Sequence, residues 1–204
     1  MKNQIQAIVC DVDGVLIKVV DDIGNFLWHK NIEADLGFSQ DQLQGFFVKY
    51  WKCISTGTID TLEAIGLYLE SINSRVSSQQ FIQYWHQNDS NVDELMIDAM
   101  RILKSKGYRL FLGTNQEKYR ANHLWDTLGF SDCFEDIFAS CYIGYEKPAY
   151  DYFVAVHRKM GIQPHEILFI DDSNKNVESA KSCGWQGYCH QSFKQTKKDI
   201  FDYL

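Results

Sequence analysis

Two aspartates separated by one residue follow an apolar run near the start of the chain. In the segment AIVCDVDGVLIK (7–18), Asp11 and Asp13 come at the end of this run and are followed by Gly14. In an extended strand Val12 points away from its two neighbours, so both carboxylates face one side. A carboxylate can act as a nucleophile, as a proton donor or acceptor, or as a metal ligand. Gly14 allows a tight turn directly after the strand.

Three later segments carry polar residues in similar positions. Thr114 and Asn115 end the run YRLFLGTN, and Asp171 and Asp172 end the run EILFIDD. The segment GYEKP places Lys147 just before a helical pattern. Neighbouring carboxylates raise one another's pKa, and Mg²⁺ with oxygen ligands relieves that repulsion. A hydroxyl, backbone N–H groups at helix starts and a lysine ammonium beside the metal would bind phosphate, so the set predicts phosphoryl chemistry.

These residues depend for their position on a series of apolar runs. Their near-continuous Ile, Leu, Val and Phe content is typical of parallel strands that are buried on both faces. The expected strands are 5–11, 108–115, 136–144 and 166–172, with a weaker one at 185–190. Helical patterns that end before a glycine separate the later strands, at 117–128, 149–160 and 174–183. The alternation predicts a doubly wound α/β fold, in which ligands bind at the carboxyl ends of the strands.

The interval 20–92 breaks this alternation. Its apolar residues recur with the spacing of buried helix faces, and polar loops separate the helical stretches. We therefore expect a Rossmann-like core made of residues 1–19 and 93–204, with a small helical cap domain inserted at 20–92.

Composition and charge restrict the class of protein. The chain has 204 residues, 45% of them hydrophobic, which supports compact domains with a core. The formal net charge of -7, without a basic patch, argues against nucleic acid as a partner. No segment is long enough to span a bilayer, and the first apolar stretch is too short for a signal peptide. The 6 cysteines form no C-x-x-C pair, so we expect free thiols and a cytoplasmic protein, either a monomer or a homodimer.

The four polar segments together resemble the motifs of the haloacid dehalogenase (HAD) superfamily of hydrolases, in the branch with a helical C1 cap. The matching segments are DVDGV (11–15), LFLGTN (110–115), the lysine of EKP (146–148) and FIDDSNKN (169–176). The resemblance spans nearly the whole chain. It implies a Mg²⁺-dependent phosphatase that hydrolyses a small phosphate monoester, for example a sugar phosphate, through an aspartyl-phosphate intermediate.

The resemblance also implies roles for single residues. Asp11 would be the nucleophile that attacks phosphorus. Asp13 would protonate the leaving oxygen and then help to activate the hydrolytic water. Thr114, the backbone of Asn115 and Lys147 would bind the oxygens of the transferring phosphoryl group.

The same resemblance implies a set of metal ligands. Mg²⁺ would be bound by Asp11, by the carbonyl of Asp13 and by the acids of the fourth motif. Asp172 aligns with the more regular ligand of the family, and Asp171 would lie close to the metal. Asn176 would either support these acids or lie on a helix surface.

Two alternatives stay open at this point. A phosphosugar mutase of the same superfamily would share all four motifs, but residues 20–92 contain only Arg75 where a second phosphate would favour an arginine pair. A non-catalytic binding module on the same fold is disfavoured because the catalytic set is complete. The presence of Asp13 argues against a dehalogenase, which needs no proton for its leaving group. The expected partner is therefore a small phosphorylated metabolite.

Substrate choice is expected to depend on the inserted segment. Most of its aromatic residues read as core, and one or two could face the active site: Trp28, Phe46, Phe47, Tyr50 and Trp51. The loop STGTID (55–60) is a candidate contact for the leaving group. The alternative for this loop is an ordinary helix–helix turn in which Thr58 or Asp60 caps the next helix.

Overall fold

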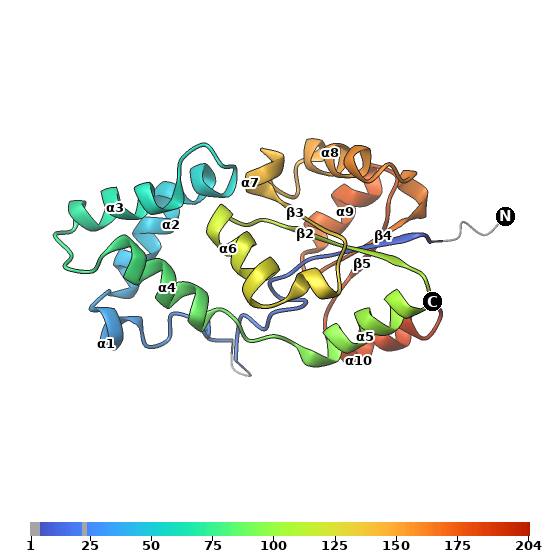
Figure 1. The fold of residues 1–204 in the computed structure, drawn as a ribbon, viewed down its shortest axis with the longest axis horizontal. Coiled ribbons are helices and arrows are strands. Elements are labelled where there is room, and N and C mark those ends of the chain that lie inside the picture. Colours follow the sequence, from blue (N-terminus) through green and yellow to red (C-terminus); the bar gives the residue numbers. More distant parts are fainter. Residues whose placement is uncertain (1–4, 22–23) are drawn as a thin grey trace.

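A five-stranded parallel sheet forms the centre of the molecule, for which the computed structural model describes residues 5–21 and 24–204. The strand order is β3-β2-β1-β4-β5, so β1 lies in the middle and the winding of the chain reverses there (Figure 1). The strands are β1 (Ala7–Cys10), β2 (Arg109–Thr114), β3 (Asp136–Ala139), β4 (Ile167–Asp171) and β5 (Gln186–Cys189). This reversal point is where ligands bind in open α/β sheets.

The register brings the candidate residues to one edge of the sheet. Cys10, the last residue of β1, pairs with Leu112 of β2 and with Ile170 of β4. The residues that follow these three positions therefore lie at the same level, at the carboxyl ends of the strands, and they include Asp11 and Asp171. This arrangement follows from parallel pairing, because the carboxyl ends of all the strands point the same way.

Helices cover both faces of the sheet, which confirms the doubly wound α/β fold. On one face, Ile8 and Cys10 pack with Met96 and Met100 of α5 (Glu94–Ser105). The C-terminal helical segments on that face are α10 (Phe193–Thr196) and the π-helical turn η4 (Lys197–Phe201). On the other face lie α8 (Tyr150–Met160) and α9 (Asn174–Ser182), which pack against side chains such as Val9 and Phe169. The sheet separates these two apolar clusters, and α8 and α9 lie on the opposite side of it from α5 and α10 (Figure 1).

The strand expected at 136–144 is wrong in its second half. Residues Ser140–Ile143 form a short helix, α7, rather than a continuation of β3. β3 pairs only with β2, and the last pair is Thr114 with Ala139. Beyond that pair β2 has ended, so the chain has no neighbour that could extend the strand.

The helix expected at 117–128 is interrupted. It consists of α6 (Lys118–Asn122) and a π-helical turn η1 (His123–Thr127), followed by the short 3-10 helix η2 (Phe130–Asp132). The side chain of Glu117 caps α6 by accepting hydrogen bonds from the backbone N–H groups of Tyr119 and Arg120. A π-helical turn inside a helix is often found beside a functional site.

The described residues of the segment 20–92 form four helices around a core of their own. They are α1 (Ile32–Leu36), α2 (Gln40–Ser55), α3 (Thr61–Ser71) and α4 (Ser78–Asn88). Buried side chains that include Phe38, Phe46, Ile65 and Phe81 form this second core. The helices lie together beside the sheet and its own helices (Figure 1).

Helix starts in this segment follow local sequence signals. Ser39 and Ser77 form capping boxes with the glutamines three residues later, and Asp60 caps α3 by accepting from the N–H of Leu62. The loop STGTID therefore forms a helix–helix turn in which Asp60 caps the next helix. This confirms the second of the two interpretations of the loop. A close approach also shapes it. Gly57 has φ +71, and a side-chain carbon there would lie 2.4 Å from the carbonyl oxygen of Cys141.

The chain enters and leaves this segment side by side. Ile17 forms an antiparallel bridge with Val92, and the N–H of Lys18 donates to the carbonyl of Asn91 at 2.8 Å. The boundaries at 19/20 and 92/93 stay a prediction. Residues 1–4 of the expected core and 22–23 of the expected cap lie outside the described residues. Within the described chain, no helix is both long and apolar enough to cross a membrane.

Candidate active site

Lys147 lies between two buried carboxylates at the edge of the sheet. Its Nζ is 2.8 Å from Oδ1 of Asp11, which follows β1, and 2.7 Å from Oδ2 of Asp171, the last residue of β4. Thr114, the last residue of β2, is buried at the same edge. Four residues chosen from sequence are thus brought together from separate parts of the chain.

Burial dominates the electrostatics of this cluster. Loss of hydration raises the pKa of Asp11 well above its usual value, although the Lys147 ammonium opposes that rise. For Lys147, burial works to lower the pKa, but the charges of Asp11 and Asp171 outweigh it and hold the pKa above its usual value. Burial and the charge of Asp171 also raise the pKa of Asp172. One ammonium does not balance these carboxylates, so the cluster favours additional positive charge.

Three carboxylates are close enough to share a metal ion. One oxygen each of Asp11, Asp171 and Asp172 lie within 4.8 Å of one another. An all-oxygen set with excess negative charge fits a hard dication such as Mg²⁺. Asp171 already accepts from Lys147, from the N–H of Ser173 at 2.8 Å and from Nδ2 of Asn176 at 3.0 Å. Asp11 and the exposed Asp172 therefore have more lone pairs available for a cation.

A close approach of the chain next to Asp172 requires glycine. Gly14 has φ +80, in the left-handed region that glycine adopts without strain. A side-chain carbon at Gly14 would lie only 2.3 Å from Oδ2 of Asp172. The turn after β1 and the loop after β4 can therefore meet only because residue 14 has no side chain.

Asp13 lies apart from the lysine, in a second polar group. Its Oδ2 accepts a hydrogen bond from the side-chain amide of Gln116, and its Oδ1 is 3.7 Å from Nη2 of Arg120. Burial, together with the nearby charge of Asp89, raises the pKa of Asp13 to about 6, against the opposing effects of Arg120 and Gln116. A carboxyl group with this pKa can both donate and accept a proton near neutral pH.

Arg120 connects Asp13 to the end of the helical segment. The guanidinium is fully buried, and its Nη2 lies 3.3 Å from Oδ2 of Asp89 and also donates to the Asp89 carbonyl. The sequence interpretation missed Arg120, Gln116 and Asp89. The one local signal was that Gln116 and Arg120 are polar residues two and six positions after Thr114, and it did not indicate which way their side chains point.

Asn115 has a structural contact that the sequence did not predict. Its Nδ2 donates to the carbonyl of Lys147 at 2.9 Å, and the N–H of Lys147 donates to its Oδ1 at 2.8 Å. This pair of bonds holds the backbone of Lys147 in place. Asn176, left open as support or surface, contacts both oxygens of Asp171.

Two acidic side chains join the helical segment to the sheet domain. The fully buried Glu117 accepts from Oγ1 of Thr61 in α3 at 2.6 Å and lies 3.2 Å from Nε2 of His86 in α4. Glu146, next to Lys147, accepts from the side chains of Lys52 and Ser55 in α2. Both contacts involve residues adjacent to a candidate site residue, so the helices α2, α3 and α4 are fastened close to the chemistry.

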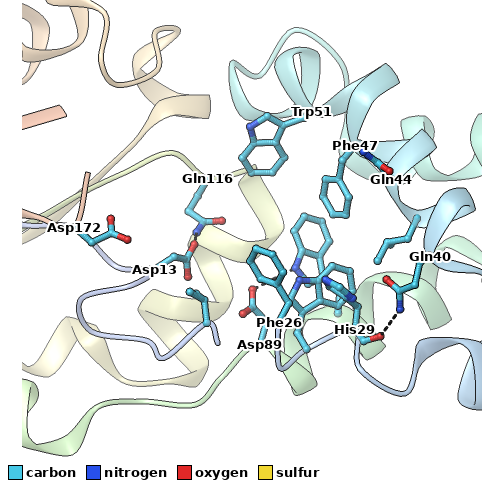
Figure 2. Close-up of a pocket in the computed structure, with 14 residues that line it drawn as sticks. Asp13, Phe26, His29, Gln40, Gln44, Phe47, Trp51, Asp89, Gln116 and Asp172 are labelled. Carbon is cyan, nitrogen blue, oxygen red and sulfur yellow. Dashed lines mark hydrogen bonds between the residues drawn. The ribbon is translucent and has the colours of Figure 1, made fainter. Parts of the chain in front are cut away.

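A cavity of about 710 Å³ opens beside these groups, between the sheet edge and the helical segment. Asp13, Gln116 and Asp172 line one end of it, and aromatic side chains of the helical segment line the other (Figure 2). The loop 55–60, predicted as a possible contact, contributes no residue to the lining that the structure describes. The predicted contact between this loop and the leaving group is therefore wrong, because the loop packs against α7 instead.

Comparison with known proteins agrees with this geometry. A flavin mononucleotide hydrolase from Arabidopsis thaliana is 24% identical over 189 residues, covering 92% of this chain and 76% of the relative. A phosphoglycolate phosphatase from Mannheimia succiniciproducens is 23% identical, covering 90% of this chain and 84% of the relative.

Solved structures show the same fold. A predicted HAD-like hydrolase from Porphyromonas gingivalis superposes with a TM-score of 0.79 at 24% identity, covering 98% of both chains. A HAD family enzyme from Bacteroides thetaiotaomicron, in complex with magnesium and inorganic phosphate, has a TM-score of 0.75 at 23% identity and covers 92% of this chain and 94% of its own. The family model of haloacid dehalogenase-like hydrolases matches residues 5–184. The chain therefore belongs to the haloacid dehalogenase-like hydrolases.

Proposed function

We propose that this hydrolase is a Mg²⁺-dependent phosphatase that acts on a small phosphate monoester. The observation that carries the proposal is the pairing of Asp11 with Lys147 inside a group of carboxylates, with Asp13 two residues later at the mouth of a cavity. A nucleophile, a phosphate-binding cation and a proton donor are then in one place. The magnesium and phosphate bound by the Bacteroides relative support this reading, as does the similarity to a flavin mononucleotide hydrolase and to a phosphoglycolate phosphatase.

In the first step, Asp11 attacks phosphorus while the bond to the ester oxygen breaks. Asp13 gives its proton to that oxygen, so the leaving group departs as a neutral alcohol. Thr114, the backbone N–H groups that follow it and Lys147 bind the phosphoryl oxygens as charge builds up on them. The product of this step is an aspartyl phosphate on Asp11.

In the second step, the now ionised Asp13 takes a proton from a water molecule that attacks the aspartyl phosphate. The Asp11–phosphorus bond breaks, inorganic phosphate leaves and both carboxyl groups return to their starting states. Mg²⁺, held by Asp11, the Asp13 carbonyl and Asp172 with Asp171 beside it, supplies positive charge to the phosphoryl oxygens and the carboxylates when bound. The hydrogen bonds from Asn176 and Ser173 keep Asp171 oriented toward this group.

Phosphosugar mutase is the second candidate, and the cavity argues against it. A mutase must bind a second phosphate at the far end of its substrate, which requires cationic side chains. Arg75 is the single arginine of 20–92, and it is exposed and absent from the lining of the cavity. No lysine or arginine belongs to the lining that the structure describes.

Phosphate release from a panel of small esters tests the proposed function. The panel includes flavin mononucleotide, phosphoglycolate and sugar phosphates, each measured with Mg²⁺ and after chelation by EDTA. We expect release that requires Mg²⁺ and falls by at least about 10³-fold in Asp11→Asn, as the loss of a nucleophile implies. Asp98→Asn, at an exposed position of α5, is the matched control. Release that continues in Asp11→Asn or after chelation would rule out this mechanism.

A further inference from the structure

The cavity that adjoins Asp13 has an unusual balance of charge. Its acidic residues are Asp13, Asp89 and Asp172, and the described lining has no lysine or arginine. Asp13 and Asp89 share the buried Arg120, and Asp172 belongs to the candidate metal group. The charges of Asp13 and Asp89 are thus offset by a guanidinium that does not line the cavity, and no lysine or arginine of the described lining is left to face a ligand. A leaving group with its own carboxylate or phosphate would have to be buried there without a counter-charge, which is strongly unfavourable.

A neighbouring hollow contains one lysine, but that lysine is already engaged. Lys30 lines a second depression together with residues such as Gly24 and Gln40. Its Nζ lies 3.5 Å from Oδ2 of Asp21. The ammonium therefore faces a carboxylate of its own segment rather than the larger cavity.

Five aromatic rings make the wall of the cavity on the side of the helical segment: Phe26, Trp28, Phe47, Trp51 and Trp85. They support one another by ring contacts. Trp28 stacks on Trp85 at 5.6 Å between centroids, and Phe47 meets Trp85 edge to face at 5.3 Å. Phe47 and Trp51 lie one turn apart on α2 and are only half-buried, so their rings keep surface free for a ligand (Figure 2). Such a wall favours flat apolar groups, which stack on aromatic faces.

Neutral polar groups lie at the end of the cavity that is far from Asp172. Gln40, Gln44 and His29 line it, and Figure 2 shows them on the opposite side of the cavity from Asp13 and Asp172. Nδ1 of His29 is buried without a hydrogen-bond partner in the described structure. Burial also lowers the pKa of His29, so its ring is neutral at neutral pH. These groups can bind the polar edge of an uncharged heterocycle, and they offer no charge to an anion.

From these observations we infer that the leaving group is a large, uncharged and flat aromatic ring system, joined to the phosphate through a short chain. The inference rests on the proposed phosphatase function and specifies its substrate class. The phosphate lies at Asp11 and Lys147, the ester oxygen meets Asp13, and the ring stacks against Trp51 and Phe47. A volume of about 710 Å³ is far more than a two-carbon acid fills and is typical of pockets for larger ligands.

Small phosphate esters whose leaving groups differ in shape and charge test this inference. The probes are 2-(1-naphthyl)ethyl phosphate, ethyl phosphate, 2-phosphoglycolate and phosphocholine, which are all primary alkyl esters. We expect kcat/KM for the naphthylethyl ester to exceed that for ethyl phosphate by about 100-fold or more, because the naphthyl ring buries its apolar surface on the wall. 2-Phosphoglycolate should be no better than ethyl phosphate. A preference for 2-phosphoglycolate or for phosphocholine over the naphthylethyl ester would overturn the inference.

Substitution of the wall provides the second arm of the test. In Trp51→Ala, the ratio of kcat/KM for naphthylethyl phosphate to that for ethyl phosphate should fall by at least about 10-fold. The matched control is Val48→Ala on the same helix, because Val48 is 81% exposed and does not line the cavity. An unchanged ratio in Trp51→Ala would place the ring elsewhere and contradict the inference.

A binding measurement separates this inference from the proposed function. The alcohol 2-(1-naphthyl)ethanol, without any phosphate, should quench tryptophan fluorescence of the native protein and bind at least about 10-fold more weakly to Trp51→Ala. If no ester is hydrolysed but the alcohol binds in this way, the phosphatase proposal fails and the aromatic site stands. If ethyl phosphate is hydrolysed but the alcohol does not bind, the phosphatase stands and the aromatic site is refuted.

Discussion

At the sheet edge, the ammonium of Lys147 lies within 2.8 Å of two carboxylates, whereas the far wall of the adjoining cavity consists of five aromatic rings, and its described lining contains no lysine or arginine. The first region holds its groups by charge pairing and hydrogen bonds from Asn176 and Ser173. The second holds its rings by contact with one another, such as the stacking of Trp28 on Trp85. The contrast indicates that the two regions have different roles. We expect the charged groups at the sheet edge to carry out the proposed phosphatase reaction, and the shape of the cavity wall in the helical segment to select the molecule on which it acts.

The two regions are joined by buried acids rather than by apolar packing alone. Glu117 connects α3 and α4 to α6, and Arg120 on the next turn reaches Asp13. A continuous set of polar contacts therefore runs from the helical segment to the group proposed as the proton donor. Four substitutions would break or sharpen the comparison between the regions, starting with the one for which we expect the largest effect.

Lys147→Met removes the cation on which the sheet edge depends. We expect phosphate release to fall by about 10²- to 10³-fold, since a charged donor to the transferring phosphoryl group is lost. Without Mg²⁺, two buried carboxylates remain unpaired, and the free energy of unfolding should fall by about 3–5 kcal/mol. Urea unfolding with and without Mg²⁺ measures this, and the ion should stabilise the variant more than the native protein. Lys159→Met, at an exposed position of α8, is the control. Equal stability of the two variants would contradict the charge-pairing argument.

Asp13→Asn tests the proton donor between the two regions. An alkyl ester such as ethyl phosphate needs a proton on its leaving oxygen, so its first turnover should slow by about 10²-fold or more. 4-Nitrophenyl phosphate has a leaving group that departs without a proton. The variant should therefore release one equivalent of 4-nitrophenolate rapidly and then turn over slowly. Quenched-flow kinetics resolves this burst. If both esters lose the first turnover equally, Asp13 is not the proton donor.

Thr61→Val removes the hydrogen bond that links α3 to Glu117 of the sheet domain. The substitution keeps the shape of the side chain but leaves a buried carboxylate oxygen of Glu117 without its 2.6 Å donor. We expect the free energy of unfolding to fall by about 1–2 kcal/mol, as for a hydrogen bond to a charged group. Urea denaturation measures the change. Thr58→Val is the control, because Thr58 is exposed and its hydroxyl donates to the carbonyl of Cys53 in the last turn of α2, within the same helical segment. Similar losses of unfolding free energy in both variants would mean that the buried hydrogen bond from Thr61 to Glu117 stabilises the protein no more than an exposed one.

His123→Gln should give the smallest effect, and it depends on pH. Burial, and then the charges of His86 and Arg120, lower the pKa of His123 to about 4, while an unfolded histidine has a pKa of about 6.5. Between these values the unfolded chain binds the additional proton, so the stability that this histidine contributes is present above pH 6.5 and is lost as the pH falls toward 4. The difference in unfolding free energy between native protein and variant should shrink over that window. His165→Gln, at an exposed position, is the control. A difference that does not change with pH would contradict the shift.

Most of the fold could be predicted from sequence because its signals are local. Apolar runs marked the five strands, and Gly161 in the left-handed conformation ends α8 where the pattern predicted a stop. The second half of the strand expected at 136–144 could not be predicted, because the end of β3 depends on where β2 ends. The π-helical turn after α6 likewise depends on its neighbours, which a helical pattern does not record.

Part of the candidate site could likewise be predicted from local signals in the sequence. Asp11, Thr114, Lys147 and Asp171 each follow a strand or precede a helix, so the sequence by itself determined that they would meet at one edge of a parallel sheet. Their catalytic roles stay a prediction until the variants are measured.

Only the tertiary structure decided which side chains complete the site. Gln116 and Arg120 turn toward Asp13, the loop 55–60 turns away, and Phe47 and Trp51 face the cavity while Phe46 on the same helix is buried in the core. Helical periodicity indicates that a residue is on an apolar face, but one part of that face packs in the core and another part lines the cavity. Which positions of the face pack in the core and which line the cavity depends on how the helices cross and on where the buried acids hold them. Neither is encoded in the spacing of residues along one helix.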